Sequence, residues 1–322
     1  MSGPGPALDA LATAGRLRRD APLGPLTTYK FGGPARWLAE VGGVAELVEV
    51  LEARRADAAV PLLVLGRGSN VVIADAGFDG LVVRLAGEFL GVSLEGPTIT
   101  AGGAVALPRL ARFAVEHGRG GLEWCVGIPG SVGGAVVMNA GGHGSNTAEW
   151  LVDAAVLDAD AAESAVLTAA GLDLGYRHSS LEGRHIVLSA RFRTIGQPSS
   201  VGERLLREIT RWRREHQPGG TLNAGSVFKN PSGDAAGRII DALGLKGHAV
   251  GGAAVSHRHA NFFEAGPGAT AQDVHDLVAS VHDIVAKATG IDLVPEIRFA
   301  GSFREAPGEP MPAPAPIEGR GR

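Results

Sequence analysis

The sequence predicts an α/β protein that is divided into two or three domains. Its 322 residues exceed the roughly 100–150 residues of a typical single domain. Short apolar runs, typical of buried strands, alternate with amphipathic stretches of helical period along most of the chain. A Pro-Gly-Gly turn at 218–220 separates two such blocks. The elements below are assigned from these three observations.

The first block runs from Pro22 to about Leu85. The residues before it, 1–20, show no periodic pattern and are expected to be loosely structured. Apolar residues at helical spacing predict one helix here, with Val44, Leu47, Val48 and Leu51 on one face. Two continuous apolar runs, PLLVLG (61–66) and GLVVRL (80–85), predict buried strands.

A second α/β block runs from Thr98 to about Thr194 and contains a predicted helix near Leu107–His117. A strand is predicted at His185–Arg193, with an apolar face of Ile186, Leu188, Ala190 and Phe192. A long amphipathic helix is then predicted over Val201–His216, with an apolar stripe of Val201, Leu205, Leu206, Ile209 and Trp212. The residues 217–220 end this helix and mark a domain boundary.

The third block contains a predicted helix near Asp234–Leu243, closed by Gly244. A longer helix is predicted over Thr270–Thr289, with Gly290 as its C-terminal stop, and a final strand over Leu293–Phe299. The sequence from Glu305 onward is rich in proline and is expected to be disordered.

Charge and cysteine content exclude several classes of protein. The formal net charge is −4 with both signs interspersed, which gives no electrostatic footprint for nucleic acid or an anionic membrane. The single cysteine, Cys125, cannot form an intramolecular disulfide or a Cys-rich metal site. We see neither a signal peptide nor an apolar stretch suited to a membrane span. We therefore expect a cytoplasmic protein without bound metal.

Two glycine-rich loops predict a site for a dinucleotide. The first is Gly66-Arg67-Gly68-Ser69-Asn70, directly after the predicted strand 61–66. Glycine permits positive φ and close backbone approach, so successive N–H groups can point into one concavity and hold a pyrophosphate. The alternative is a tight turn between strands, which the spacing favours equally. The loop lacks the G-x-G-x-x-G pattern followed by a helix.

The second loop is Gly127-Ile128-Pro129-Gly130-Ser131-Val132-Gly133-Gly134. Its apolar setting indicates backbone packed against a flat or phosphorylated ligand, and the alternative is a close contact between helices. Together the two loops favour a bound dinucleotide. Cys125 lies beside the second loop and is interpreted as a small buried apolar residue.

Three further segments carry side chains suited to chemistry. Ser226 lies in AGSVFKNP (224–231) together with Lys229 and Asn230, without the G-x-S-x-G context of a hydrolase nucleophile. Tyr176 and Arg177 precede the strand at 185, and Arg177 has the geometry to pair with a carboxylate or phosphate.

The third segment is the final predicted strand, in which alternation places Glu296 and Arg298 on one face. Taken singly, each of these polar residues is also compatible with a turn, a solvated surface or a structural ion pair. His257 and His259 have no acidic partners nearby in sequence and are interpreted as packing or polar residues rather than metal ligands.

Taken together and in order, these motifs resemble the UDP-N-acetylenolpyruvoylglucosamine reductase family. The resemblance covers roughly Pro22 to Gly301. It is carried by LTTYKFGGPA (26–35), GRGSNVVI (66–73), GIPGSVGGAVVMNAG (127–141), YRHSS (176–180), AGSVFKNP (224–231), GLKG (244–247), HANF (259–262) and PEIRFAG (295–301). Each motif is modest alone, and their joint occurrence is specific.

The resemblance implies a fold in which a vanillyl-alcohol-oxidase-type FAD-binding region of two subdomains precedes a C-terminal substrate-binding α/β domain. It implies an N-terminal extension at 1–21, FAD-binding subdomains at 22–88 and 89–198, a substrate-binding domain at 199–303 and a disordered tail at 304–322. It also implies noncovalent FAD, NADPH as co-substrate, a UDP-sugar substrate and a monomer. In the implied reaction, the reducing equivalents of NADPH pass through FAD to the enolpyruvyl ether of UDP-N-acetylglucosamine.

The resemblance assigns roles to individual residues. Arg177, Ser226 and Glu296 are the implied catalytic residues, with Ser226 as proton donor. Tyr176, Lys229 and Asn230 are implied to contact the substrate. The cofactor-binding residues that it implies are Gly66, Arg67, Gly68, Ser69, Asn70, Gly127, Ile128, Pro129, Gly130, Ser131, Gly133, Gly134 and Arg298.

Two departures from the family pattern limit the carry-over. The chain reads Ala140-Gly141-Gly142-His143-Gly144 where the family often has Ala-Gly-Ala-Tyr-Gly, which leaves His143 without an implied role. The segment between Arg193 and Ser226 is short and lacks the Tyr-bearing substrate loop of longer members, as in the shorter subtype. The alternatives to the implied function are an FAD-dependent oxidase on the same scaffold and a non-catalytic UDP-sugar sensor.

Overall fold

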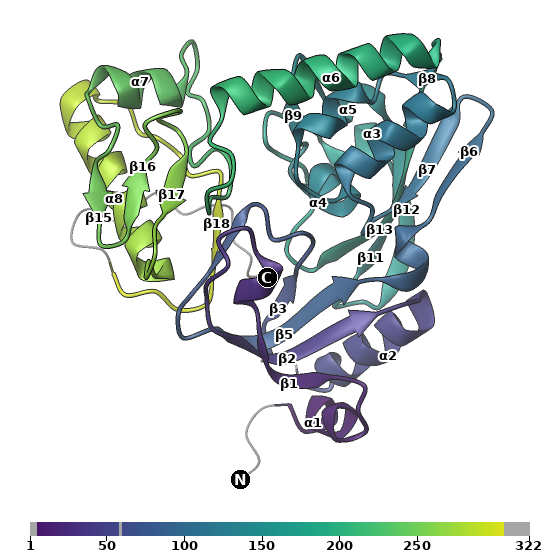
Figure 1. Cartoon of the computed structure of the whole chain (residues 1–322). Coiled ribbons are helices and arrows are strands. Elements are labelled where there is room, and N and C mark those ends of the chain that lie inside the picture. Colours follow the sequence, from purple (N-terminus) through teal and green to yellow (C-terminus); the bar gives the residue numbers. More distant parts are fainter. Residues whose placement is uncertain (1–4, 58–59, 306–322) are drawn as a thin grey trace.

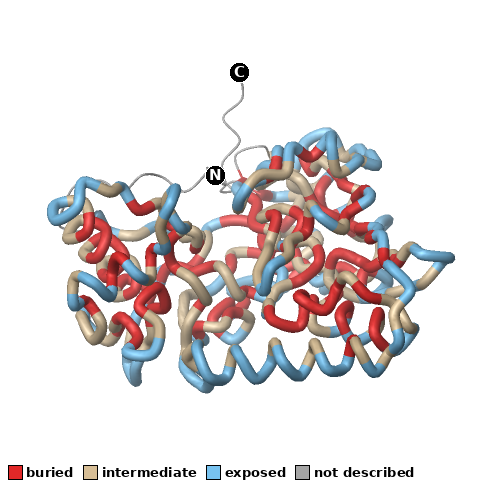
Figure 2. Tube along the Cα trace, turned by 90° about the horizontal axis from the view of Figure 1, so that it is seen from above, coloured by how far each residue is buried: buried red, intermediate tan, exposed pale blue. Residues whose placement is uncertain are grey.

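The computed structural model of the protein describes residues 5–57 and 60–305 (Figure 1). The expected disordered tail at 304–322 therefore lies outside the described residues, except for Arg304 and Glu305. Figure 1 shows an N-terminal layer at the bottom, a middle region on the right and a C-terminal lobe on the left. Buried stretches of chain run through both sides of the molecule, with exposed segments around them (Figure 2).

The N-terminal layer is a four-stranded sheet in the order β1-β2-β5-β3. Its strands are β1 (Arg18–Pro22), β2 (Pro34–Val41), β5 (Phe78–Leu85) and β3 (Leu62–Val64). β1 is antiparallel to β2, whereas β2, β5 and β3 run parallel to one another. The helix α2 (Val44–Arg55) connects β2 to β3 and buries Leu47, Val50 and Leu51. Both predicted strands and the predicted helix of this block are present.

The expectation of a loosely structured N-terminus is wrong for the described residues. Helix α1 (Pro6–Thr13) packs Leu8 into the cluster that contains Trp37 and Leu47, and the Trp37 indole N–H donates to Asp9 at 3.0 Å. β1 pairs with β2 along Arg18↔Leu38 to Pro22↔Pro34. The stretch is too short to show a period, and its order comes from contacts with residues that follow in the chain.

The middle region is a five-stranded antiparallel sheet in the order β12-β11-β13-β7-β6. Its strands are β12 (Glu163–Thr168), β11 (Leu151–Asp158), β13 (His185–Arg193), β7 (Thr98–Gly102) and β6 (Val92–Glu95). One face is covered by α3 (Leu107–Glu116), η3 (Glu123–Gly127), α4 (Val132–Val137) and α5 (Thr147–Trp150), as Figure 1 shows. The predicted helix near 107–117 and the predicted strand 185–193 are therefore confirmed.

Helix α6 (Ser199–His216) lies along the top of the middle region in Figure 1. It packs on α3 and η3, and Leu206 and Ile209 join their cluster. The predicted inward stripe is wrong at its end, because the Trp212 side chain is 43% exposed and stacks on His216 instead of entering a core. Since α6 packs on the middle region, the packing favours the boundary at 217–220 over one at 199.

The C-terminal lobe has a core of its own, built around α8 (Ala271–Thr289). Its other elements are α7 (Ala236–Ala242), β15 (Ala249–Val250), β16 (Ala253–Val255) and β17 (Phe263–Ala265). Thr270 and Asp273 form a capping box at the start of α8, and Gly290 ends the helix in the left-handed conformation. The two predicted helices of this block are confirmed.

The predicted strand over Leu293–Phe299 is wrong in extent, because the last strand, β18, spans only Arg298–Ala300. Pro295 has no N–H and interrupts a regular ladder. It instead forms an isolated antiparallel bridge with Phe228.

β18 pairs in parallel with β4 (Val71–Ile73), which joins the C-terminal lobe to the strand that follows the first glycine loop. Asp75 strengthens this junction, since its carboxylate accepts from the N–H groups of Ala271 and Gln272 at the start of α8. The buried Tyr29 hydroxyl donates to the carbonyl of Phe263 at 3.0 Å. These contacts fix the C-terminal lobe against the glycine loop.

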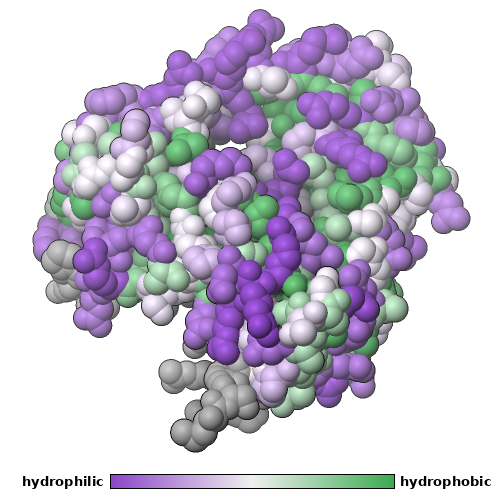
Figure 3. Space-filling model, turned by 60° about the horizontal axis from the view of Figure 1, so that its bottom comes forward, coloured by the Kyte–Doolittle hydropathy of each residue, from purple (hydrophilic) through white to green (hydrophobic). Residues whose placement is uncertain are grey.

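The remaining elements are short. They are η1 (Gly24–Leu26), η2 (Gly87–Leu90), η4 (Ala170–Leu172), β8 (Arg119–Gly120), β9 (Gly141–Gly142), β10 (Ser145–Asn146) and β14 (Ile195–Gly196). The face shown in Figure 3 is of mixed polarity, with hydrophilic residues gathered along its middle and edges. Among the helices of residues 5–57 and 60–305, none is both long enough and apolar enough to cross a membrane.

Candidate active site

A cavity of about 1030 Å³ lies where the N-terminal layer, the middle region and the C-terminal lobe meet. Both glycine loops line it, and so do all thirteen residues predicted to bind a cofactor. Arg177, Ser226 and Glu296 also line it, although they come from segments far apart in the sequence. The folded chain thus brings the predicted catalytic residues and both loops to one place.

The first loop, 66–70, connects β3 to β4 and depends on glycine at two positions. Gly68 has φ +61°, and a Cβ atom there would lie 2.4 Å from the carbonyl oxygen of Leu26. A Cβ at Gly66 would lie 2.6 Å from Oγ of Ser131 in the second loop. A side chain at Gly68 would therefore force the backbone away from its neighbours, and one at Gly66 would displace the Ser131 hydroxyl.

The same loop presents a row of free donors. Within residues 5–57 and 60–305, no protein acceptor pairs with the backbone N–H groups of the five residues 66–70. Consecutive free N–H groups beside a cavity can together bind a ligand with acceptor oxygens. The donor set fits the pyrophosphate of a dinucleotide.

The second loop is tied to the first. The Arg67 guanidinium donates from Nε to the carbonyl of Pro129 at 3.2 Å. The hydroxyl of Ser131 caps α4 by accepting from the N–H of Gly134 at 3.3 Å. Gly133 lies against the middle sheet, because its N–H donates to the carbonyl of Gly103 at 2.8 Å. The two loops therefore form one continuous wall of the cavity.

Arg177 and Glu296 form an ion pair, with 2.6 Å between Arg177 Nε and Glu296 Oε1. The two residues are 119 positions apart in sequence. Arg177 has φ +52°, a left-handed conformation that costs energy in a residue with a side chain, and it also donates to the carbonyl of Gly141 at 2.9 Å. The surrounding fold thus holds this guanidinium in a strained but defined place.

The pKa of Glu296 is raised above its ordinary value by burial, which disfavours the charged carboxylate. The charge of Arg177, its hydrogen bond and the charge of Lys229 act in the opposite direction and offset part of that rise. Glu296 therefore keeps its proton to a higher pH than a free glutamate does, even beside a guanidinium.

Ser226 follows Gly225, whose φ of +77° turns the chain into the cavity wall. Ser226 forms an isolated antiparallel bridge with Phe262. The next residue, Val227, accepts from the N–H of Glu296 at 2.7 Å. Ser226 is thus only one residue away from a direct backbone link to Glu296.

The Asn70 side chain does not lie free for a cofactor. Its side-chain Nδ2 donates to the backbone carbonyl of Glu296 at 3.0 Å, and the backbone carbonyl of Asn70 accepts from the N–H of Arg298 at 3.0 Å. Asn70 therefore fixes the Glu296–Arg298 segment against the first glycine loop.

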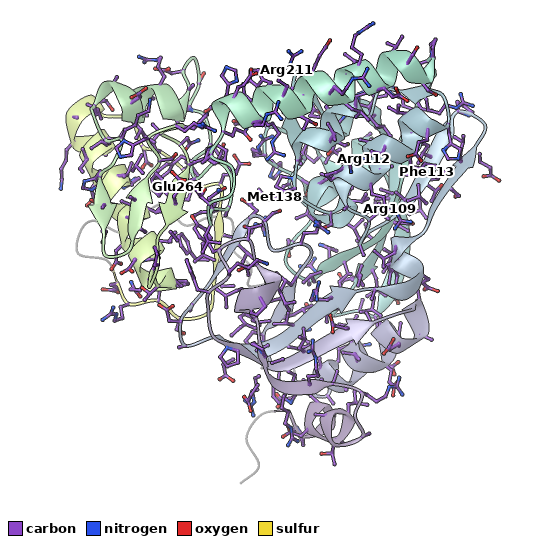
Figure 4. All side chains as sticks on the ribbon, viewed as in Figure 1. Arg109, Arg112, Phe113, Met138, Arg211 and Glu264 are labelled. Carbon is purple, nitrogen blue, oxygen red and sulfur yellow. The ribbon has the colours of Figure 1, made fainter. Side chains whose placement is uncertain are left out.

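Arg298 and Arg213 are two further cavity guanidinium groups, and burial lowers the pKa of each. No carboxylate in the described part of the chain pairs with either one. Arg298 contacts the sulfur of Met138 at 3.3 Å, and Met138 lies between the two sides of the molecule (Figure 4). Two half-buried guanidinium groups without a carboxylate partner in the described chain make the cavity suited to an anionic or electron-rich ligand. Sequence reasoning missed Arg213, which lies among several arginines of α6.

The three residues predicted to contact substrate lie beside the cavity rather than in its wall. The Tyr176 side chain is 57% exposed, and its hydroxyl accepts from the N–H of Asn230 at 3.2 Å. The Asn230 side chain accepts from the N–H of Ala236 at 3.0 Å at the start of α7. Lys229 is half-buried, and its positive charge acts to lower the pKa of Glu296.

His143, in the motif that departs from the family pattern, has φ +55° and lines the cavity. Its ring meets Trp212 edge-on, with 5.2 Å between the centroids. Burial, and then the charge of Arg213, lower the pKa of His143. Cys125 is fully buried, and burial raises the pKa of its thiol well above the ordinary value. The interpretation of Cys125 as a buried apolar residue is therefore confirmed.

Two family models match the chain. One is described as the FAD binding domain and matches residues 35–163. The other is described as the C-terminal domain of UDP-N-acetylenolpyruvoylglucosamine reductase and matches residues 217–300. The first contains both glycine loops, and the second contains Ser226 and Glu296.

Relatives match along nearly the whole chain. A UDP-N-acetylenolpyruvoylglucosamine reductase of Synechococcus sp. (strain WH7803) is 42% identical over 300 residues, which are 91% of this chain and 96% of the relative. A UDP-N-acetylenolpyruvoylglucosamine reductase 2 of Symbiobacterium thermophilum is 40% identical over 288 residues, 89% and 93% of the two chains. The crystal structure of UDP-N-acetylenolpyruvylglucosamine reductase from Thermus caldophilus superposes with a TM-score of 0.77 at 36% identity. It covers 88% of this chain and 100% of that one.

Proposed function

Since this chain belongs to the UDP-N-acetylenolpyruvoylglucosamine reductase family, we propose that it performs the family's reaction with Arg177, Ser226 and Glu296 acting on the substrate. The reaction is the NADPH-dependent, FAD-mediated reduction of UDP-N-acetylglucosamine enolpyruvate to UDP-N-acetylmuramate, a step of peptidoglycan precursor synthesis. The family resemblance and the fold class inferred from the motifs are confirmed. The single observation that carries the residue assignment is that these three side chains line one cavity with both glycine loops.

The five free N–H groups of 66–70 would hold the pyrophosphate of FAD, and the second loop would lie along the rest of the cofactor. Bound FAD supplies a two-electron carrier between NADPH and the carbon–carbon double bond of the substrate. Arg298 would add positive charge to this part of the cavity. The fully buried Cys125 does not line the cavity, which supports noncovalent binding.

Arg177 and Glu296 would stabilise the charge that develops on the substrate. Addition of a hydride to the terminal carbon leaves negative charge on the α-carbon and its carboxylate. The Arg177 guanidinium is held by Glu296 and by the carbonyl of Gly141 before the substrate arrives, so it needs no reorganisation when the charge appears. The raised pKa of Glu296 favours a protonated carboxyl that can donate to that charge.

Ser226 would then give its proton to the α-carbon, which completes the reduction of the double bond. An alcohol is a weak acid, and it transfers a proton here only because the carbanion is strongly basic. Lys229, whose charge reaches Glu296, would stabilise the alkoxide that remains. Tyr176 and Asn230, joined by a hydrogen bond beside the cavity, would contact the substrate from its edge.

We propose a monomer as the working unit. The substrate is a small UDP-sugar, and we place the reaction in the cytoplasm. An oxidase on the same scaffold would pass electrons to oxygen instead, and a UDP-sugar sensor would have no use for a proton donor.

Anaerobic spectroscopy separates these functions. We expect the purified yellow protein to lose the visible absorbance of its oxidised flavin when NADPH is added. UDP-N-acetylglucosamine enolpyruvate should then restore the absorbance without oxygen. If oxygen restores the colour and the UDP-sugar does not, the chain is an oxidase. If NADPH causes no bleaching, the proposed activity is wrong.

A Gly68→Ala substitution is expected to weaken FAD binding by at least about tenfold, because the new Cβ would push the loop off the carbonyl of Leu26. Gly96→Ala is the matched control. Gly96 also has positive φ, +55°, but a Cβ there meets nothing within 4 Å. Flavin content per protein, measured from absorbance after dialysis, should fall in Gly68→Ala and stay at the wild-type level in Gly96→Ala. Equal flavin content in the two variants would contradict the role of this loop.

A further inference from the structure

The segment that carries Ser226 lies between two other segments of the C-terminal lobe. On one side, the N–H of Glu296 donates to Val227 at 2.7 Å and the N–H of Lys229 donates to Val294 at 2.9 Å. On the other side, the N–H of Val227 donates to the carbonyl of Asn261 at 2.8 Å. Val227 therefore connects Asn261 directly to Glu296, and Ser226 is its neighbour in the chain.

The N–H and carbonyl of Phe228 find no hydrogen-bond partner in the neighbouring segment 294–296. It faces Pro295 in an antiparallel bridge whose hydrogen bonds are made by the flanking residues. The N–H and carbonyl of Phe228 consequently point away from Pro295. Phe228 is only 1% exposed, so water does not reach these two polar groups.

The side chain of Asn261 supplies both missing partners. Its Oδ1 accepts from the N–H of Phe228 at 2.9 Å, and its Nδ2 donates to the carbonyl of Phe228 at 2.8 Å. A carboxamide carries one acceptor and one donor side by side, as a peptide group does, so it takes the place of a neighbouring strand. Asn261 is 3% exposed, and the hydrogen bond from its own N–H to Nδ1 of His259 holds it in a turn.

We propose that Asn261 is a positioning residue that holds the segment 226–228 in register with Glu296 and so directs the Ser226 hydroxyl at the substrate α-carbon. This inference rests on the proposed role of Ser226 as proton donor. Asn261 does not line the cavity and acts only through the backbone of Val227 and Phe228. Without its carboxamide, the buried N–H and carbonyl of Phe228, two residues from Ser226, would lose their partners. The segment would then shift to find others.

Gln272 offers a matched control in the same lobe. Its carboxamide also holds both backbone polar groups of one residue, accepting from the N–H of Arg304 at 3.0 Å and donating to its carbonyl at 3.2 Å. Gln272 is 9% exposed and has no link to Ser226 in the described chain. Asn261→Leu and Gln272→Leu therefore each remove a carboxamide that holds the backbone of one other residue, and only Asn261 adjoins the site; Gln272 also donates to Asp276 at 2.7 Å.

The test compares these variants with Ser226→Ala in the two half-reactions. We expect both Asn261→Leu and Gln272→Leu to lower Tm by a few degrees, with the larger loss in Asn261→Leu because Phe228 is buried and Arg304 is exposed, and both to leave flavin reduction by NADPH within about twofold of wild type. Asn261→Leu alone should slow reoxidation by UDP-N-acetylglucosamine enolpyruvate by about 10²-fold, as expected when a reacting group is displaced by about 1 Å.

The product reports the position of Ser226 directly. In the reaction, the π bond breaks and two C–H bonds form, one from a hydride and one from a proton, and the α-carbon becomes a stereocentre. In D₂O, wild type should give one diastereomer with deuterium at that carbon, seen by NMR. Asn261→Leu should give a mixture, because solvent then delivers the deuteron from either side. Loss of stability alone would not change this ratio.

Each outcome decides a different claim. If Ser226→Ala does not reoxidise and Asn261→Leu is slow with a mixed product, the inference holds. If Ser226→Ala does not reoxidise but Asn261→Leu matches Gln272→Leu and gives one diastereomer, Asn261 has no positioning role. A wild-type rate in Ser226→Ala would instead remove the proposed proton donor, and the inference with it. Should Asn261→Leu not fold, Asn261→Asp keeps the shape and the acceptor but not the donor, and the same product criterion applies.

Discussion

Replacement of Ser226 by alanine is expected to slow reduction of the UDP-sugar by about 10³-fold or more while NADPH still reduces the flavin at close to the wild-type rate. General acid catalysis by a positioned side chain contributes roughly 10²–10⁴-fold to a rate. Removing one oxygen from a residue that is only partly buried should cost little stability. The protein should therefore fold, bind FAD and stop at the second half-reaction.

Stopped-flow absorbance measures the two half-reactions separately. NADPH is mixed with oxidised protein in one experiment, and the UDP-sugar with reduced protein in the other. Ser256→Ala is the control, because Ser256 is a buried serine of the same lobe that does not line the cavity. Equal slowing of both half-reactions in Ser226→Ala would indicate a defect in flavin binding and not in proton transfer.

Glu296→Gln is expected to lower the rate of UDP-sugar reduction by about 10²–10³-fold, the usual cost of losing one donor to a developing charge. The pH dependence gives a sharper test. Burial raises the pKa of Glu296, so its protonated form persists above the range of a free glutamate. If that form donates to the substrate, the rate is constant below the raised pKa and falls tenfold per pH unit above it. Glutamine cannot ionise, so this descending limb should be absent from Glu296→Gln.

The measurement is the single-turnover rate of reoxidation between about pH 4 and pH 9, a range that includes both the ordinary pKa of a glutamate, about 4.3, and a raised one. Glu264→Gln is the control, since Glu264 lies in the same lobe (Figure 4) but does not line the main cavity. It should keep both the rate and the descending limb of wild type. A limb that persists unchanged in Glu296→Gln would assign the titration to another group, and His143, whose pKa is lowered, would be the first to test.

Most of the fold could be predicted from the spacing of apolar residues along the sequence. The strand at 185–193 and the helices that begin near 107, 201 and 270 follow from apolar residues at strand or helix spacing, and the structure confirms them. Periodicity failed where the chain depends on distant partners. Residues 6–22 become ordered only through Trp37 and β2, and Pro295 breaks a strand that hydrophobicity alone would continue.

Some residues of the candidate site could likewise be predicted from the sequence, and others could not. The glycine loops were visible in the sequence because glycine at positive φ and close approach is a local requirement. Arg213 and Asn261 were not visible, because an arginine among arginines and an asparagine in a turn carry no local signal. Arg213 matters because its guanidinium has no carboxylate partner among the described residues. Asn261 matters because its side chain pairs with the buried backbone of Phe228.

The amino-acid sequence by itself determined the family, the FAD-binding and substrate-binding parts, and the residue types available for the reaction. It could do so because each motif contains the residues that its part of the site needs, and the motifs occur in a fixed order. Only the tertiary structure decided that Arg177 meets Glu296 across 119 positions, that Asn70 holds the Glu296 segment and that Asn261 holds the Ser226 segment. Such pairings depend on which distant groups are buried together. Burial decides whether a polar group must find a protein partner or can bond to water.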